Sequence, residues 1–307
     1  MNSTPLPDLT PTTGARRLGL PEGVRLEEGA GGLRRVVVET PVASAVVYLQ
    51  GAHVTSWVPA GHADVLWVSR RSAFAPGAPI RGGVPVCYPW FGPHPSDGTA
   101  PLHGFARVAV WTLESADEAD GVATLTFALD TAGIPGVLAH EPAVLRYTVS
   151  VGTELQLALQ VTNAGPDPLV VEEAFHTYLA VRDVRRASLH GLEDTPGVDR
   201  LTGQELVPTG GPMTLSGETD RLLAQPGEIR VDDPAGARSV TVRAAESANA
   251  VVWNPGPVKA AAMPDFGDDE WTGMLCVETC NVADGCVAVA PGTTHTMTAT
   301  LTVDALD

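Results

Sequence analysis

The sequence predicts an all-β protein, folded as a sandwich or a barrel of antiparallel strands. The prediction rests on three observations. Short runs rich in β-branched residues recur about every ten residues, with alternating polarity and with Gly, Pro, Asp or Asn at their ends. No segment carries a convincing amphipathic helical stripe of roughly ten residues or more. No internal repeat is present, which argues against a propeller.

The expected strands follow one another from residue 34 to the C-terminal region. The run at 155–163 shows the pattern most clearly, because Leu or Val at the odd positions alternates with Gln, Ala or Thr at the even ones. Such alternation suits an antiparallel strand with one face on a core. Short helical turns are expected only at 69–74 and 265–271. The expected strands span residues 34–40, 44–50, 53–59, 64–69, 122–130, 145–164 and 295–305.

One large domain over residues 23–307 is the most economical organisation. No shift in composition marks a linker, and a hydrophobic fraction of 44% in 307 residues allows a large core. Residues 1–22 are rich in Pro, Thr and Gly and lack periodicity, so we expect a flexible N-terminal tail there. The 32 glycines and 26 prolines exceed average usage but follow no collagen-like period.

The charge of the chain excludes several classes of partner. Its 19 Lys and Arg against 36 Asp and Glu give a net charge of −17 and an isoelectric point of about 4.7. A protein this acidic repels nucleic acid and anionic membranes, so we expect neither as a partner. We expect a monomer that acts on a small molecule. An anionic substrate would require local Arg or Lys residues that overcome the overall negative field.

The cysteines and the N-terminus indicate a cytoplasmic protein. No CxxC pair or zinc-finger spacing is present, so we expect reduced thiols. A disulfide from Cys276 or Cys280 to Cys286 is the alternative. The N-terminus lacks the apolar core of a secretory signal, and no apolar run reaches the ~20 residues that span a bilayer. The four cysteines are Cys87, Cys276, Cys280 and Cys286.

Three segments gather polar residues of a kind that protein cores avoid. In the first, Arg81 precedes two glycines, which allow the backbone to approach a ligand while the guanidinium offers planar donors to hydroxyl or phosphate oxygens. A glycine turn beside a surface arginine is the alternative. His103 and Arg107 are four residues apart, which in a strand places both on one face. The segments are residues 80–107, 172–178 and 251–281.

His176 and Glu278 are the candidate acid–base residues. His176 lies among apolar neighbours, where an imidazole is costly unless hydrogen-bonded, and histidine titrates near neutrality. A buried structural histidine is the alternative. Glu278 is the single charge in the strand-like run GMLCVETC and shares a face with Cys276. A carboxylate so placed should have a raised pKa and could act as a general acid or base, unless it lies on the rim of the sheet.

Other kinds of site find little support in the sequence. The GxSxG, P-loop and GxGxxG motifs are absent, and so is the histidine spacing of zinc proteases. We therefore expect no metal and no cofactor. Lys259 and Asp265 could contact a ligand, but a solvated loop is the favoured interpretation for both.

A series of motifs in a fixed order resembles one enzyme family, the hexose-6-phosphate mutarotases or glucose-6-phosphate 1-epimerases. This family is a branch of the aldose 1-epimerase, or galactose mutarotase-like, superfamily. The resemblance extends from about residue 51 to the C-terminal strands, and its specific parts are RGGxPVCxPWFGP and HGFAR. The motifs are GAHVTSW, LWVS, IRGGVPVCYPWFGP, PLHGFAR, FHTYL, VVWNP, MPDF and CVE.

The resemblance implies a large antiparallel β-supersandwich with an open cleft and a reaction that interconverts sugar anomers. It implies that Glu278 is the catalytic base and His176 the catalytic acid, opening and closing the sugar ring without metal, cofactor or covalent intermediate. It also implies substrate contacts from Arg81, Arg107 and His103. The implied substrate is an aldohexose 6-phosphate, most simply glucose 6-phosphate.

The resemblance implies one further substrate contact and shows one departure. Asp199 aligns with an aspartate that contacts substrate in the family, and Asp194 is the alternative alignment. Leu102 stands where family members carry a glutamine that contacts substrate. Three other functions stay open: mutarotation of unphosphorylated aldoses, carbohydrate binding without turnover, and polysaccharide cleavage by a lyase or hydrolase. A longer chain with a helical domain would be expected for the last of these.

Overall fold

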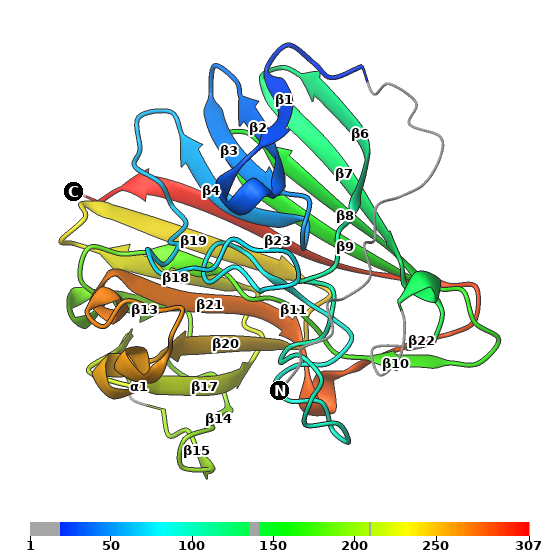
Figure 1. The fold of residues 1–307 in the computed structure, drawn as a ribbon. Helices are drawn as coiled ribbons and strands as arrows, with labels where there is room; N and C mark the ends of the chain where they lie inside the picture. Colours follow the sequence, from blue (N-terminus) through cyan, green and yellow to red (C-terminus); the bar gives the residue numbers. More distant parts are fainter. Residues whose placement is uncertain (1–18, 135–140, 209, 307) are drawn as a thin grey trace.

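The computed structural model describes residues 19–134, 141–208 and 210–306. Residues 1–18 of the expected tail lie outside this description. Figure 1 shows the described strands as extended sheets stacked on one another, with the N-terminal strands at one end. The large sheets are antiparallel throughout. The expected all-β class is confirmed.

The largest sheet carries nine of the described strands. Its central strands are long and alternate buried residues with partly or fully exposed ones, as period-two sequences dictate. In sheet order the strands are β16 (Met213–Thr214), β13 (Ser188–His190), β18 (Glu228–Asp233), β19 (Arg238–Ala245), β23 (Thr294–Ala305), β9 (Leu155–Asn163), β8 (Ala143–Val151), β7 (Val122–Asp130) and β6 (Thr112–Ala119).

A second sheet, of eight described strands, carries the candidate site. Its strand β21 is buried along its whole length, so both of its faces are covered. In sheet order the strands are β15 (Gln204–Glu205), β14 (Gly197–Asp199), β17 (Thr219–Ala224), β20 (Asn249–Asn254), β21 (Met274–Asn281), β11 (Glu173–Phe175) and β5 (Val86–Cys87), with β12 (Tyr178–Ala180) also paired to β21.

Smaller elements complete the described part of the chain. A four-stranded sheet and a two-stranded ribbon flank the large sheets, and one short α-helix follows β20. They are β1 (Val24–Glu28), β2 (Arg34–Glu39), β3 (Ala43–Tyr48) and β4 (His53–Pro59); β10 (Leu169–Val171) and β22 (Val287–Val289); α1 (Gly256–Ala262); and the 3₁₀ turns η1 (Ala30–Gly32), η2 (Thr131–Gly133), η4 (Val184–Arg186), η5 (Glu270–Gly273) and η6 (Ala283–Gly285).

The main core joins the sheets. One cluster of buried side chains contains residues from all three of the larger sheets. The nine-stranded sheet contributes Phe127 and Tyr147, the eight-stranded sheet Phe175 and Val277, and the four-stranded sheet Trp57. Burying a large apolar side chain contributes about 1.5–3 kcal/mol. This core leaves the other face of the eight-stranded sheet free to carry polar chemistry.

Most expected strands are confirmed, and of the two expected short helical turns only the one at 265–271 is confirmed in part, by turns that lead into the 3₁₀ turn η5. The runs at 34–40, 53–59 and 122–130 form β2, β4 and β7. The run at 64–69 makes only isolated bridges. The expected turn at 69–74 is not helical, whereas α1 forms where no helix was expected. Lys259, on α1, pairs with Glu218 at 3.0 Å.

The cysteines are free thiols, so the disulfide alternative is wrong. Cys87, Cys276 and Cys280 are buried, and Cys286 is exposed. Among the described residues, no helix is both long and apolar enough to cross a membrane.

Candidate active site

The carboxylate of Glu278 and the imidazole of His176 meet in the eight-stranded sheet. Their Oε1 and Nδ1 atoms are 3.4 Å apart, and both residues are buried. Strand pairing creates this contact. Because β11 and β12 both pair with β21, the break between them leaves His176 and Thr177 opposite the middle of β21. The backbone N–H of His176 donates instead to the carbonyl oxygen of Pro85, at 3.0 Å.

Neither member of this pair has its hydrogen-bonding capacity filled. Among the described residues, His176 Nδ1 and Glu278 Oε2 are buried without a hydrogen-bond partner. Burial lowers the pKa of His176 well below 6.5, and His103, Arg81 and Arg107 lower it further. Burial raises the pKa of Glu278 well above 4.5. Neighbouring groups with perturbed pKa values and free polar atoms are suited to exchange protons with a ligand.

Aromatic rings hold the imidazole of His176 in one orientation. Tyr178 stacks on it with ring centroids 4.8 Å apart and an interplanar angle of 7°. Trp253 and His103 meet it edge-on, at centroid distances of 6.0 and 5.4 Å. Stacked and edge-on contacts are the geometries that ring quadrupoles favour. The expectation that His176 and Tyr178 share one face is confirmed.

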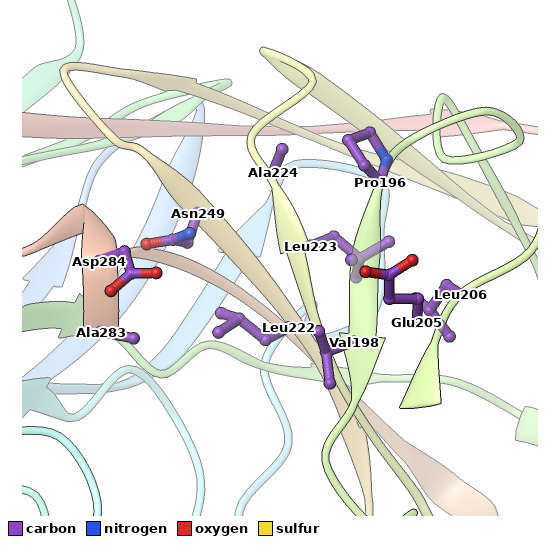
Figure 2. Close-up of a pocket in the computed structure, with 11 residues that line it drawn as sticks. Pro196, Val198, Glu205, Leu206, Leu222, Leu223, Ala224, Asn249, Ala283 and Asp284 are labelled. Carbon is purple, nitrogen blue, oxygen red and sulfur yellow. The ribbon is translucent and has the colours of Figure 1, made fainter. Parts of the chain in front are cut away.

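The sheet face that carries Glu278 continues toward a cavity of about 450 Å³. In register, Glu278 lies opposite Val251, and Val251 lies opposite Leu222, so the three side chains share a face. Leu222 lies in the cavity wall, with Asn249 and Asp284 at one end of it (Figure 2). The acid–base pair does not line this cavity, which is an extension of the same face.

His103 adds a neutral imidazole to the site. His103 lies in a turn with φ 60° and not in a strand. The expectation that a strand places His103 and Arg107 on one face is therefore wrong. The backbone N–H of Gly92 donates to its Nδ1 at 3.2 Å, so the neutral ring carries its proton on Nε2. Burial, then the charges of Arg107, Arg81 and Arg200, lowers the pKa of His103 to about 3. His103 is therefore a hydrogen-bond donor at neutral pH.

Arg81 is oriented by two partners from other segments. Its Nη1 donates to the Tyr178 hydroxyl at 3.0 Å, and its Nε and Nη2 lie 3.1 and 3.0 Å from Asp265 Oδ2. Asp265 therefore positions a site residue, and the expectation of a solvated loop is wrong for it. A Cβ on Gly82, whose φ is 120°, would lie 2.3 Å from the carbonyl oxygen of Trp67. This glycine therefore admits protein backbone and not a ligand.

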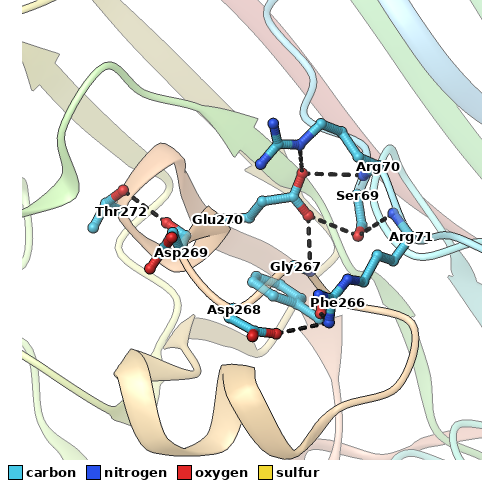
Figure 3. Close-up of polar contacts among 9 residues, drawn as sticks. All are labelled: Ser69, Arg70, Arg71, Phe266, Gly267, Asp268, Asp269, Glu270 and Thr272. Carbon is cyan, nitrogen blue, oxygen red and sulfur yellow. Dashed lines mark hydrogen bonds and ion pairs between the residues drawn. The ribbon is translucent and has the colours of Figure 1, made fainter.

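A buried carboxylate, Glu270, fixes the loop that carries Asp265. Its Oε2 accepts from Ser69 Oγ at 2.8 Å and from the Gly267 N–H at 2.9 Å (Figure 3). Its Oε1 accepts from the backbone N–H and the Nε of Arg70 at 3.1 and 2.7 Å. Burial by itself would raise the pKa of Glu270, but these hydrogen bonds outweigh it and lower the pKa below 4.5. The carboxylate joins two segments that are distant in the sequence.

Glu270→Gln should destabilise the protein by about 1–3 kcal/mol, the cost of leaving buried donors without their charged acceptor, because its ion-pair partner Arg70 is itself exposed. The amide would turn a donor toward groups that are themselves donors. Because folding lowers the pKa of Glu270, its contribution is present above pH 4.5 and is lost as the pH falls through the folded-state pKa. Urea unfolding at neutral and acidic pH measures both effects, and the difference between variant and wild type should shrink in acid.

Asp268 offers a matched control for this variant. It is an exposed carboxylate of the same loop, 2.7 Å from Arg71 Nη1. Asp268→Asn should change the free energy of unfolding by no more than about 1 kcal/mol, as exposed ion pairs do. Equal losses in Glu270→Gln and Asp268→Asn would contradict the role given to Glu270, and so would a loss that does not shrink in acid.

Arg107 is a buried cation with few partners. It is only 8% exposed. Its Nη2 donates to the carbonyl oxygen of Leu102 at 2.5 Å, and its buried Nε has no hydrogen-bond partner among the described residues. No carboxylate in the described part of the chain forms an ion pair with it. Burial lowers the pKa of Arg107. An unpaired buried charge is costly, so an anion that reaches this group would bind favourably.

Arg200 and Asp220 also lie at the candidate site, although neither was predicted from the sequence. The Arg200 guanidinium lies 5.4 Å from the ring centroid of Phe91, and that ring is 4.6 Å from the ring of His103. Arg200 Nη1 lies 3.6 Å from Asp220 Oδ1. After burial, Asp220 is the strongest influence that raises the pKa of Glu278. Alternation within 219–224 could have assigned Asp220 to a face, but only strand pairing identifies that face as the site.

The structure does not bring Asp199 to this cluster. In the strand register Asp199 lies opposite Arg221 of β17. The side chain of Arg221 is on the opposite sheet face from that of Leu222, and Leu222 shares the face of Glu278. Its Oδ1 accepts from the backbone N–H groups of Leu201 and Thr202 at 2.9 and 3.2 Å. It lines a separate cavity of about 440 Å³. A substrate contact from Asp199 therefore stays a prediction, separate from the acid–base pair.

Comparisons with known proteins agree on one family. The model of the aldose 1-epimerase family matches residues 34–302. A relative from Escherichia coli strain K12, with the provisional name glucose-6-phosphate 1-epimerase, is 40% identical over 247 residues, 80% of this chain and 82% of the relative. A Salmonella typhimurium strain LT2 relative with the same provisional name is 35% identical over 246 residues, with 80% and 82% coverage.

A solved structure agrees with the sequence relatives. The crystal structure of the Salmonella typhimurium protein YeaD, provisionally titled a mutarotase, has a TM-score of 0.85 to this chain at 30% identity. The match covers 94% of this chain and 96% of that protein. The galactose mutarotase-like form of the expected β-supersandwich is therefore confirmed.

The layered antiparallel fold holds a carboxylate and an imidazole in contact, an arrangement suited to an enzyme that works by general acid–base chemistry. The chain belongs to the aldose 1-epimerase family, which matches it over residues 34–302. It is therefore an epimerase, and its reaction interconverts the anomers of an aldose sugar. The expected family and the expected class of enzyme are both confirmed.

Proposed function

We propose that the chain interconverts the α and β anomers of a hexose 6-phosphate, with glucose 6-phosphate as the preferred substrate. Arg107 is the observation that carries this proposal, because it is a buried guanidinium without a carboxylate partner in a protein of net charge −17. A phosphate group, with a charge of about −1.5 to −2 at pH 7, would supply the anion. The names of the two bacterial relatives refer to the same substrate.

In the proposed reaction Glu278 removes the proton of the C1 hydroxyl while His176 protonates the ring oxygen. The C1–O5 bond breaks, its electron pair stays on the protonated ring oxygen, and C1 becomes an aldehyde carbon. Rotation about C1–C2 presents the other face, and ring closure returns both protons in reverse. Both oxygens are bonded to C1, so two groups 3.4 Å apart suit their spacing. Each proton transfer contributes about 10²- to 10⁴-fold.

The arginines would couple phosphate binding to this proton transfer. Arg81 and Arg107 lower the pKa of His176, and Arg200 adds to the positive field at His103. A phosphate beside them would cancel part of that field and so raise the pKa of His176. More of the imidazole would then be protonated, which is the form that a general acid needs. His103, as a neutral donor through Nε2, would hydrogen-bond a hydroxyl or the ring oxygen of the sugar.

An unphosphorylated aldose is the second candidate substrate, and one observation favours it. Arg81 and Arg200 already have carboxylate partners in Asp265 and Asp220, so neither requires an anion. In that case Arg81 would bind sugar hydroxyls. A small-molecule substrate without nucleic-acid or membrane partners, a monomeric state and a cytoplasmic location remain part of the proposal.

Replacing Arg81 separates the two substrates. Arg81→Ala should raise KM for glucose 6-phosphate at least about tenfold, the loss of ~1.4 kcal/mol, and should change KM for free glucose much less. A charge-assisted hydrogen bond to phosphate is typically worth about 1.5–3 kcal/mol, which accommodates this loss. The measurement is the rate of α-to-β conversion on each sugar.

The matched control is Arg71→Ala, which removes the same charge from an exposed side chain of a neighbouring loop. It should leave both KM values within about twofold of wild type, because exposed ion pairs contribute little. If Arg81→Ala weakens both sugars equally, the arginine binds hydroxyls, and the unphosphorylated aldose becomes the better assignment.

A further inference from the structure

The thiol of Cys276 lies beside the acid–base pair. One ligand atom each from Cys276, His176 and Glu278 can be chosen so that all three lie within 4.8 Å of one another. Cys276 and Glu278 are two positions apart in β21, so their side chains share a face. All three residues are buried. The proposed reaction makes no use of the thiol.

We propose that Cys276, His176 and Glu278 form a binding site for a zinc-type divalent cation, and that an ion bound there inhibits the epimerase. Sulfur, imidazole nitrogen and carboxylate oxygen are the ligands that Zn²⁺ prefers, and three protein ligands leave a fourth position for water. The ion would occupy both groups that must exchange protons with the sugar. Metal and substrate would therefore compete for one site.

Unpartnered atoms point to a ligand at this position. His176 Nδ1 and Glu278 Oε2 are buried without a hydrogen-bond partner among the described residues. The neighbouring thiol of Cys280 is different, because it donates to the carbonyl oxygen of Asn249 at 3.5 Å. Cys276 forms no such bond within the described part of the chain. Each of the three residues of the proposed site therefore carries a ligand atom without a hydrogen-bond partner among the described residues.

The separations suit a tetrahedral ion. Two ligands bound at about 2.0–2.2 Å in tetrahedral geometry are roughly 3.4 Å apart. The Nδ1 of His176 and the Oε1 of Glu278 are 3.4 Å apart. A thiolate sulfur bound at about 2.3 Å from the ion would lie roughly 3.6 Å from the nitrogen and oxygen ligands. The sulfur of Cys276 now lies within 4.8 Å of both, so it would have to move closer to them by about 1 Å at most.

The charges set the expected strength of binding. A thiolate and a carboxylate together balance a divalent ion, and binding releases two protons, one from the thiol and one from the His176–Glu278 pair. Arg81 and Arg107 act on the same centre, since both lower the pKa of His176, and they oppose a cation. We therefore expect reversible binding that is weaker than in a structural zinc site.

Titration of the full-length protein with Co²⁺, a spectroscopic substitute for Zn²⁺, tests the site. Wild type should bind Co²⁺ saturably, with tetrahedral d–d absorption and a thiolate-to-cobalt charge-transfer band that Zn²⁺ removes. Cys276→Ala should lose the charge-transfer band and bind at least about tenfold more weakly, a change of ~1.4 kcal/mol. The matched control, Cys280→Ala, changes the other buried thiol beside Glu278 and should keep both signals.

Inhibition provides the second measurement. Zn²⁺ should inhibit wild type and Cys280→Ala, and EDTA should restore their activity, whereas Cys276→Ala should require at least about tenfold more Zn²⁺. Thermal unfolding checks that the variants are folded, and Cys276→Ser replaces Cys276→Ala if the latter does not fold. The absence of saturable Co²⁺ binding by wild type, or an equal loss of the band in Cys280→Ala, would overturn the proposal. The cobalt titration uses no sugar, so it is independent of the proposed substrate.

Discussion

Glu278→Gln and His176→Asn should each lower kcat for glucose 6-phosphate by about 10²- to 10⁴-fold while the protein stays folded. Glutamine cannot take up the C1 hydroxyl proton, and asparagine cannot protonate the ring oxygen. Neither change removes a hydrogen bond of Glu278 Oε2 or His176 Nδ1 to a described residue. His176→Asn also loses the ring contacts to Tyr178 and Trp253, each worth about 0.5–1.5 kcal/mol, so its stability should fall more than that of Glu278→Gln. Turnover measured by NMR exchange between anomers, with thermal unfolding in parallel, checks both parts of the expectation.

Glu173 is the matched control for these variants. It is a fully buried carboxylate that pairs with His295 at 2.8 Å, and its neighbour Ala174 lies on the opposite, site-facing side of β11. Glu173→Gln should lower stability and leave kcat nearly unchanged. If Glu278→Gln or His176→Asn keeps more than about a tenth of the wild-type rate, that residue is neither general acid nor general base.

Arg107→Met should weaken glucose 6-phosphate binding without weakening the fold. We expect KM to rise at least about tenfold, because a charge-assisted bond to phosphate is worth about 1.5–3 kcal/mol. The free energy of unfolding should stay unchanged or rise, by up to about 1–4 kcal/mol, as when apolar groups of similar volume replace buried charges. Steady-state kinetics and urea unfolding of the same preparation measure the two effects.

Arg238 is the matched control for Arg107, because it is a buried arginine whose guanidinium has several hydrogen-bond acceptors. Its guanidinium donates to the carbonyl oxygens of Ala63, Asp64 and Ala180, at 3.1, 3.0 and 2.6 Å. Arg238→Met should leave KM unchanged and should cost about 1–3 kcal/mol or more, because buried carbonyls lose their donors. If Arg107→Met destabilises the protein as strongly and leaves KM unchanged, Arg107 is a structural residue and the phosphate proposal loses its main support.

The predictable part of this fold depends on local alternation. Residues 155–163 form β9 with the odd positions buried, as their pattern predicts, because a period of two places every second side chain against the core. The run that carries Glu278 forms β21 for the same reason. His176 and Tyr178 lie on one face although two strands meet between them, because both flank the break opposite β21.

The parts that failed depend on contacts between distant segments. Asp265 resembles a loop residue until its partner Arg81, 184 positions away, is known. Asp220 faces the site only because β17 pairs with β20 and β20 with β21. The segment at 69–74 does not form a helix, since Ser69 Oγ and the Arg70 N–H bond to Glu270 and the Ser69 N–H bonds to the carbonyl oxygen of Arg81. Such pairings have no local signal in a single sequence.

The α-helix α1 was missed for a different reason. It spans only Gly256–Ala262 and has a proline within its first turn. Seven residues are too few to show a helical hydrophobic period, and Gly and Pro usually indicate a turn. Proline in the first turn of a helix is nevertheless favourable, because the missing N–H has no intrahelical partner there.

The most direct test of the proposed function is kcat/KM for α-to-β conversion by the wild-type protein, measured side by side on glucose 6-phosphate and glucose. The two sugars differ only in the phosphate, so their ratio reports what the arginines contribute to the transition state. The buried guanidinium of Arg107 and the oriented guanidinium of Arg81 predict a ratio of at least about ten in favour of glucose 6-phosphate. Equal values, or a preference for glucose, would contradict a hexose 6-phosphate as the substrate.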